Sequence, residues 1–372
     1  MAAIVWVVLL MAVLYLAQRL VFNLLGFRSL TYSRSFSSLR LHAGQSVWMN
    51  ETIANRKRMP LPWLRVESML PAQLVFKQRE SDMAIHRGDR LQNHASLFSV
   101  PPYTEIVRKH EVVCPQRGRY RVDSYTITLG DWIGVPGKSD KRTADCELVV
   151  YPAVKDIRDF PLDARKYLQS VRSAASPIME DHPHVAGIRP YREGDSFRMV
   201  NWSATAKTGQ LLVHKRESMQ DNDLTILLNA ELLDQEHNRR ITSEQFEDAL
   251  SYAASAAHYV ISGGGKAGFI FNGVRGEGQT EIYRAPARAG AAHMDNLLEA
   301  MAEFRPVTAL GLSYLLEQLI EERKRGLNYL LVTAFIDGKQ EKLIARLRSQ
   351  GNTVQPLLLW KEEAANGRKT GT

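Results

Sequence analysis

The chain begins with a long apolar stretch. Residues 2–17 read "AAIVWVVLLMAVLYLA" without a charge, and after two polar residues the pattern continues as "LVFNLLGF" to Phe27. A membrane-spanning helix needs about 20 such residues. That length is reached at Leu25, provided that the long Arg19 side chain extends to the interface. No basic residue precedes the stretch and no small-x-small cleavage site follows it, so residues 1–27 predict an uncleaved anchor rather than a signal peptide.

Residues 28–150 consist of short alternating runs of the β type. "LRLHAGQSVWMNETIANR" predicts two short strands broken at Gly44 and Asn50, and "LPWLRVESMLP" predicts a strand between prolines. "YTEIVRKHEVVC" and "YRVDSYTITLG" also alternate, and the "PQRGRY" between them has turn chemistry. Many short strands with frequent turns indicate a β-sandwich-like or barrel-like region.

The pattern changes again in residues 221–360. Buried strands such as "DLTILLN", "KAGFIFN" and "NYLLVTAF" alternate with helical segments, the first of which has Ser243 as its expected N-cap. Strands that alternate with helices predict an open, mostly parallel α/β sheet. Residues 151–220 connect the two regions, and the polar residues 361–372 predict a disordered tail.

Composition adds only weak constraints. The 372 residues suggest two or three domains. Lys and Arg outnumber Asp and Glu by 48 to 40, an excess that suits an anionic membrane surface, nucleic acid or mere solubility. No motif of interleaved aromatic and basic residues supports nucleic-acid binding. The two cysteines, Cys114 and Cys146, form no disulfide framework and fit a reducing compartment, although a single bridge stays open.

Basic residues on one side of the apolar stretch predict its orientation. Four arginines follow within about 20 residues. They are Arg19, Arg28, Arg34 and Arg40. The positive-inside bias therefore predicts a single-pass protein of the cell membrane with its N-terminus outside and its soluble domains in the cytoplasm.

The stretch "GIRPYREGDSFRMVNWSATAKTGQLLVHKRES", residues 187–218, is rich in Arg and Lys. Three interpretations are open: a structural joint, which we favour, a contact surface for a partner, and a catalytic site. In the first, Asp195 caps a short helix over "SFRMVNWSATAKTG", and Trp202 covers a neighbouring element. An arginine, Arg189 or Arg198, pairs with Asp195 and fixes the turn.

Two other groups of residues have ligand chemistry. His182 and His184 stand beside Asp181, and together with the Arg-rich stretch they make a metal-dependent hydrolase or another enzyme the alternative hypothesis. No third convergent ligand is evident there. Polar residues also follow the predicted parallel strands, at the edge where α/β sheets bind ligands. Ordinary loop polarity is the favoured explanation for them, and no catalytic residue, metal or cofactor is predicted.

The Arg-rich stretch resembles the signature of the bacterial domain of unknown function 58 family, R-x-Y-x-x-G-D-x-x-R-x-I-x-W-x-x-x-A. The matching residues are Arg189, Tyr191, Gly194, Asp195, Arg198, Trp202 and Ala206. Val200 stands at the apolar position, and Asn201 stands where an Asp is common. The order of parts is similar too: a membrane segment, a β-rich region, the signature and an α/β domain.

The resemblance implies that the α/β domain is von Willebrand factor A-like and that the partner is a MoxR-type AAA+ ATPase. No enzymatic activity follows from it. Many von Willebrand A domains bind a divalent metal through D-x-S-x-S, a Thr and a later Asp. The corresponding positions here are Asn229, Glu231, Leu233, Thr308 and, after Thr333, Ala334. This set predicts a degenerate, metal-free site, and the chain as a whole predicts a membrane-anchored interaction or scaffold protein.

Overall fold

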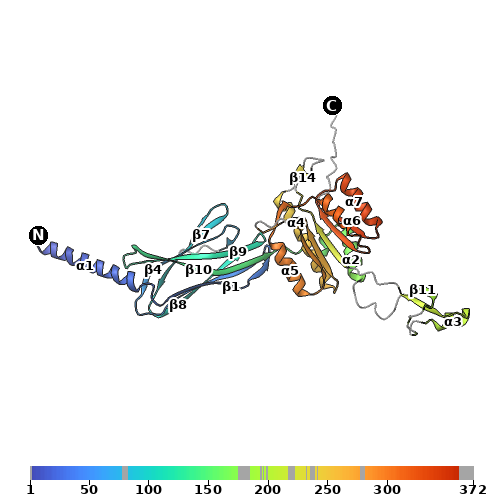
Figure 1. The fold of residues 1–372 in the computed structure, drawn as a ribbon. Helices are drawn as coiled ribbons and strands as arrows, with labels where there is room; N and C mark the ends of the chain where they lie inside the picture. The colour runs from blue at the N-terminus through green and yellow to red at the C-terminus, as the bar shows by residue number, and fades with distance from the viewer. Residues whose placement is uncertain are drawn as a thin grey trace, which may run out of the picture. The chain divides into compact units, whose positions relative to one another are not determined.

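The computed structural model describes most of the chain (Figure 1). The described residues are 2–77, 83–174, 185–192, 195, 197, 200–216, 223–231, 233–234, 239–240, 242–276 and 281–359. They form two compact units. The first is Met1–Ala153 with Met301–Glu303, and the second is Val154–Ala300 with Phe304–Thr372.

Helix α1, Ala2–Leu25, is the apolar stretch at the start of the chain. Its segment Ile4–Leu25 has a mean hydropathy of 2.2 and is long enough to cross a membrane. Nearly all of its large apolar side chains are exposed, which water alone would not favour. The predicted helix of spanning length is therefore confirmed. Phe22 differs from the others because it is buried against the strands of the first unit.

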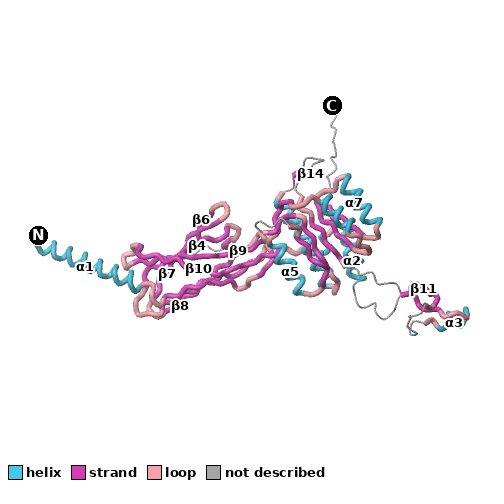
Figure 2. Tube along the Cα trace, viewed as in Figure 1, coloured by secondary structure: helices cyan, strands magenta, loops and turns pink. Residues whose placement is uncertain are grey.

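The rest of the first unit is built from two sheets (Figure 2). One has the order β1-β3-β8-β5 and the other β2-β10-β9-β4-β7-β6. The strands are β1 Leu30–Phe36, β2 Arg40–His42, β3 Ser46–Asn55, β4 Leu61–Pro71, β5 Val75–Phe76, β6 Met83–Arg87, β7 Leu91–Val100, β8 Thr104–Val113, β9 Gly118–Gly130 and β10 Pro136–Tyr151. Pairing is antiparallel except between β2 and β10. The predicted sandwich-like β region is confirmed.

Alternation along β3 shows how the sequence determines this packing. Val47, Met49 and Ile53 are buried inward positions, separated by two and four residues as the period of two along a strand requires. The predicted break at Asn50 is wrong, because Asn50 occupies an outward position and pairs in register with Ser35 and Lys109. Polarity at an outward position leaves the strand intact.

The second unit contains a five-stranded sheet with the order β18-β16-β13-β20-β21. Its strands are β13 Leu224–Leu228, β16 Ala267–Phe271, β18 Tyr283–Arg288, β20 Asn328–Thr333 and β21 Thr353–Leu358. Only β18 runs antiparallel to its neighbour. The helices are α2 Leu162–Ala174, α4 Ser243–Ser262, α5 Ala291–Ala302, α6 Leu312–Glu321 and α7 Gly338–Ser349. Side chains of α6 and α7 share a core cluster with one face of the sheet, and α4 packs on the strands as well.

Shorter elements complete the second unit. They are η1 Ile157–Asp159, β14 Leu233–Asp234 paired with β15 Arg239–Arg240, and β17 Gly273–Arg275 paired with β19 Phe304–Thr308. The expected N-cap Ser243 is wrong by one residue. The Thr242 side chain accepts from the Gln245 backbone N–H, and the Gln245 side chain returns a bond to the Thr242 backbone, which is a capping box. The mixed α/β class is confirmed for this region.

Candidate interaction site

The signature stretch folds as a hairpin with an inserted helix. Strand β11, Val185–Pro190, pairs antiparallel with β12, Leu212–Arg216. Between them the chain bridges back at Val200, which pairs with Val213. Both valines are buried, so they form a small core for the hairpin.

An arginine–aspartate pair closes the turn after β11. Arg189 donates from both terminal nitrogens to the two oxygens of Asp195, at 2.7 Å each. The backbone N–H of Arg192 donates to Asp195 as well, at 2.8 Å. The hydrogen bonds from Arg189 and from the Arg192 backbone lower the pKa of Asp195 to about 2, so this carboxylate is ionised at neutral pH. The bidentate geometry fixes the turn as well as pairing the charges.

The short helix α3, Trp202–Thr208, has its own cap. The side chain of Asn201 accepts from the backbone N–H of Ala204 at 3.0 Å. The expectation that Asp195 caps this helix is therefore wrong, because the helix begins seven residues after Asp195, whose oxygens are taken by the turn. Gly194 and Arg198 lie outside the described residues, so the structure gives no position for these two signature residues.

The hairpin exposes large apolar side chains. Phe197 is 65% exposed and Trp202 is 63% exposed, and Ile188 and Leu211 are exposed as well. Tyr191 stacks on Phe197 with ring centroids 5.8 Å apart. The expectation that Trp202 covers a neighbouring element is wrong, since the two valines already fill the small core and the indole faces outward. Such side chains on a braced support are typical of contact surfaces.

The predicted polar edge of the α/β sheet is brought together by the fold. Asn229 directly follows β13 and donates to Thr333 Oγ1 at 3.1 Å, at the end of the neighbouring β20. Asn272, at the end of β16, donates to Asn229 Oδ1 at 2.8 Å and accepts from the Ala230 backbone. Asn272 was not predicted, although a polar residue directly after the buried run "AGFIF" is the signal that marks it.

Glu231 and Thr308 complete this edge. One Glu231 oxygen accepts from the Leu312 backbone N–H at 2.8 Å, at the start of α6, and the other accepts from Gln340 at 3.3 Å. Thr308 donates to the carbonyl of Ala230 at 3.1 Å. These groups satisfy one another and the adjoining loops, so the geometry describes a brace between strand ends and helix starts.

Replacing Glu231 by alanine is expected to lower the free energy of unfolding by about 1–2 kcal/mol, because the first turn of α6 loses its acceptor. Thermal and denaturant unfolding of the full chain in detergent measure the change. The control is Glu341→Ala in the first turn of α7, where Asp337 already provides the cap, and it should lose less than half as much. Equal losses in the two variants would contradict the bracing role.

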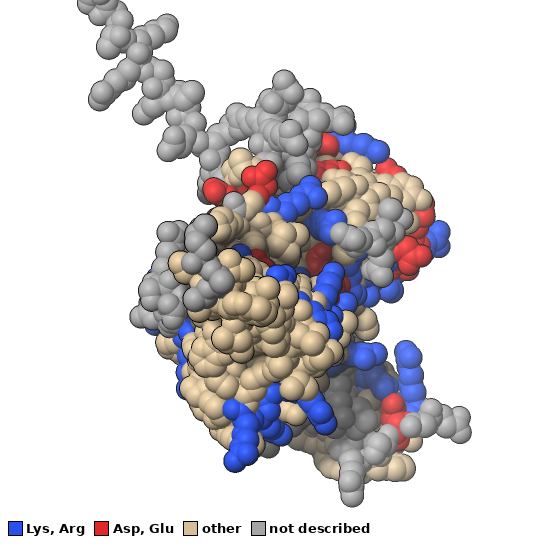
Figure 3. All heavy atoms as spheres, turned by 90° about the vertical axis from the view of Figure 1, so that its left-hand side faces the viewer, with Lys and Arg blue, Asp and Glu red and all other residues tan. Residues whose placement is uncertain are grey.

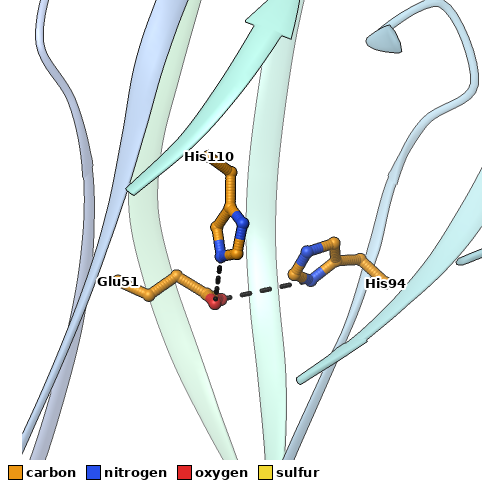
Figure 4. A group of neighbouring side chains, drawn as sticks. All are labelled: Glu51, His94 and His110. Atoms are coloured by element: carbon orange, nitrogen blue, oxygen red, sulfur yellow. Dashed lines mark hydrogen bonds and ion pairs between the residues drawn. The ribbon is translucent and has the colours of Figure 1, made fainter. Parts of the chain in front are cut away.

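A third group of polar side chains lies inside the first unit and was missed by the sequence analysis. Glu51 of β3, His94 of β7 and His110 of β8 converge in the sandwich (Figure 4). Glu51 Oε2 accepts from Ser96 at 2.8 Å and lies 3.1 Å from His110 Nε2. Their ligand-type atoms lie within 4.8 Å of one another, which by itself suits a metal.

The remaining partners of Glu51 argue against a cation at this position. Glu51 Oε1 accepts from Tyr32 at 2.6 Å and from Arg34 at 2.5 Å. Glu51 is fully buried and the Arg34 side chain is 2% exposed. The guanidinium already provides the positive charge, and a metal ion would have to displace it or lie against it. The cluster therefore fits a buried ion pair with its hydrogen-bond shell. Arg34, one of the four arginines that follow the apolar stretch, is therefore part of this core.

Comparison with known proteins gives one family match, which lies in the C-terminal half of the chain, and one longer match to a relative. Residues 187–364 match the family described as "Protein of unknown function DUF58". The "Uncharacterized protein YeaD" of Bacillus subtilis (strain 168) is 26% identical over 278 residues, which are 74% of this chain and 62% of YeaD. The chain therefore covers less than two thirds of that relative's length. His182, His184 and Asp181, on which the enzyme alternative depends, lie outside the described residues.

Solved structures with local similarity share little sequence with the chain. A non-cellulosomal cohesin from the archaeon Archaeoglobus fulgidus is 10% identical, with a TM-score of 0.22, over 32% of this chain and 89% of that one. The native α-2-macroglobulin of E. coli is 18% identical, with a TM-score of 0.25, over 34% of this chain and 10% of that one.

Proposed function

We propose that this protein is a membrane-anchored interaction protein that binds its partner through the signature hairpin. The observation that carries the proposal is the exposure of Phe197 and Trp202 on a module that holds its own shape. Tryptophan and arginine are the residues that most often dominate protein–protein binding energy. Because the Arg189–Asp195 pair already fixes the turn, the exposed side chains Phe197 and Trp202 lose little conformational entropy on binding.

The partner we propose is a MoxR-type AAA+ ATPase, on the strength of the family signature. The described part of the hairpin carries several basic residues, so the matching surface on the ATPase would be acidic and contain an apolar pocket. We also propose that the α/β domain is von Willebrand A-like and metal-free. Support comes from its parallel strands and from the polar edge, where Asn229 and Glu231 occupy ligand positions yet bind protein groups.

Anchoring by α1 is the second part of the proposal. A 22-residue apolar segment with exposed side chains suits a bilayer better than water. We propose that the N-terminus lies outside and that the two units lie in the cytoplasm, where an ATPase would reach the hairpin. Retention in the pellet after alkaline extraction of membranes tests the anchor separately from the partner.

Trp202→Ser should reduce recovery of the ATPase by tenfold or more, because a central tryptophan contributes about 2 kcal/mol or more to binding. Affinity purification of the full-length protein from membranes, with and without ATP, measures the recovery. The matched control is Trp48→Ser, since Trp48 is an exposed tryptophan of the first unit. Failure to recover an ATPase in either nucleotide state, or equal recovery with both variants, would overturn the proposal.

A further inference from the structure

Three loops of the first unit lie at one end of the sandwich. Leu30 of β1 pairs with Asn55 of β3, and Asn55 pairs with Thr104 of β8. In the other sheet Leu61 of β4 pairs with Val100 of β7, and Trp63 of β4 pairs with Gly130, the last residue of β9. The loops at this end are 56–60, 101–103 and 131–135, and together with residues 26–29 we call them the tip surface. Strand register alone therefore places the tip surface where α1 joins the sandwich (Figure 1).

Helix α1 is fixed to this surface rather than linked flexibly. Lys57 donates to the carbonyls of Gly26 and Arg28, just after the helix ends. Phe22 packs edge-on against Trp132, with ring centroids 6.5 Å apart. Phe22 lies three residues before the end of α1, which corresponds to about 5 Å along the axis. Trp132 is therefore level with the last turn of the apolar helix.

The loop 131–135 presents apolar side chains outward in a held conformation. The buried Asp131 carboxylate accepts from the backbone N–H groups of Ile133 at 3.0 Å and Val135 at 2.9 Å. Gly134 takes a positive φ of 80° that completes the turn. Trp132 is 59% exposed and Ile133 is 70% exposed. The buried Asp131 carboxylate therefore holds the loop in a conformation that exposes Trp132 and Ile133.

Basic residues surround these apolar side chains. The tip surface contains four basic residues, Arg28, Arg56, Lys57 and Arg58, and one acidic residue, the buried Asp131. Lys138 of β10 lies three residues beyond it. Figure 3 views the molecule from the side of α1, and there Lys and Arg side chains lie around a largely uncharged surface. Aromatic and aliphatic residues flanked by positive charge are typical of protein surfaces at the headgroup layer.

We propose that the tip surface is seated in the headgroup layer of the same bilayer that α1 spans. Trp132 and Ile133 enter the interface, and Arg28, Arg56 and Arg58 bind anionic lipid headgroups. The inference rests on the proposed anchor and goes beyond it, because a tether alone would leave the first unit free in water. Seating at two places, helix and loops, fixes the orientation of the first unit relative to the membrane.

Site-specific fluorescence in nanodiscs tests the proposal on the full-length chain. An environment-sensitive dye is attached to Ile133→Cys, with Leu39→Cys as the matched control. Leu39 is also exposed and apolar, but it lies beyond the other end of β1, about 20 Å or more from the tip. The native cysteines Cys114 and Cys146 are buried, so labelling under native conditions favours the introduced thiol.

The dye at residue 133 should emit at shorter wavelength than the dye at residue 39, and lipids with a shallow nitroxide should quench it selectively. Equal, water-like emission and no quenching at both sites would overturn the inference. A third labelled variant, Leu14→Cys, reports on α1 itself. If deep nitroxides quench the dye at residue 14 but no nitroxide quenches the dye at residue 133, the seating of the tip surface is wrong and the anchor stands. If neither dye is quenched, the proposed membrane anchor is wrong.

The electrostatic part is tested with lipid composition. Quenching at residue 133 should rise when phosphatidylglycerol is added to phosphatidylcholine nanodiscs, and each basic residue near an anionic surface is worth about fivefold in the seating equilibrium. Replacing Arg28, Arg56 and Arg58 together by glutamine should abolish the dependence on phosphatidylglycerol. If quenching does not respond to the anionic lipid, the proposed contact with anionic headgroups is wrong.

Discussion

Replacing Glu51 by glutamine is expected to lower the free energy of unfolding of the first unit by about 3–5 kcal/mol. Glutamine keeps the shape of the side chain and removes its charge. The Arg34 guanidinium, 2% exposed and 2.5 Å from the carboxylate, would then be a buried cation without a counter-charge. Burial by itself would raise the pKa of Glu51, but the hydrogen bond from His110 and the charge of Arg34 outweigh it. The pKa therefore lies well below its usual range, and the native carboxylate is charged.

Urea unfolding of the full chain in detergent, followed by tryptophan fluorescence, measures this loss. Glu67→Gln is the matched control, because Glu67 pairs with Arg65 at 2.7 Å on the surface and should lose less than about 1 kcal/mol. The double variant Arg34→Met with Glu51→Gln removes both charges and should recover a large part of the loss. If Glu51→Gln lowers the free energy of unfolding by less than about 1 kcal/mol, the buried Arg34 guanidinium does not need the charge of Glu51.

The alternation of apolar residues was sufficient to predict the β region. It gave no sign of Glu51, a carboxylate buried within that region. On β3, Glu51 stands between the inward positions Met49 and Ile53, where a period of two predicts an apolar residue. Its partners come from β1, β7 and β8, at separations of 17 to 59 residues. No local pattern contains such pairs, and only the pairing of strands brings them together.

In the signature hairpin, by contrast, the errors of prediction concern a local detail, the residue at which the short helix begins. Its residue types predicted a turn, a short helix and a strand, and the Arg189–Asp195 pair was one of two considered. The predicted roles of Asp195 as a helix cap and of Trp202 as a covering side chain both depended on where the helix begins. That position is determined by a single capping hydrogen bond, which the residue types do not specify. Asn201 is one residue before Trp202 and binds the Ala204 backbone, so the helix starts there and the indole faces out. Short helices have no amphipathic stripe long enough to settle the question from sequence.

The polar edge of the α/β sheet lies between these cases. Parallel strands put their carboxyl ends along one edge, so the meeting of Asn229 with Thr333 followed from topology. What the side chains do there did not follow. Glu231 turns to the start of α6, where unpaired backbone N–H groups and the helix dipole attract a carboxylate. An acidic residue at such an edge therefore has a structural use that sequence alone does not separate from metal binding.

Lowering the pH from 6.5 toward 4 is expected to cost the first unit about 3 kcal/mol through His94 alone. Burial lowers the pKa of His94 to about 4, so the folded chain holds it neutral, stacked on Phe76, while the unfolded chain takes up a proton near pH 6.5. Between these values the unfolded state binds more protons, and stability rises with pH. The contribution of Glu51, whose pKa lies below its usual range, is lost only at lower pH.

Unfolding free energies measured at a series of pH values between 6.5 and 5 give the slope, which should approach 1.4 kcal/mol per pH unit from this residue. His94→Gln should flatten the slope whatever its effect on absolute stability, since no imidazole then titrates at this position. Ser96→Ala removes a hydrogen bond to Glu51 but no titratable group, so it should lower stability at every pH and keep the wild-type slope. An unchanged slope in His94→Gln would show that His94 is not held neutral by the fold, and the buried cluster would then have to tolerate two positive charges, on His94 and on Arg34, 3.5 Å apart.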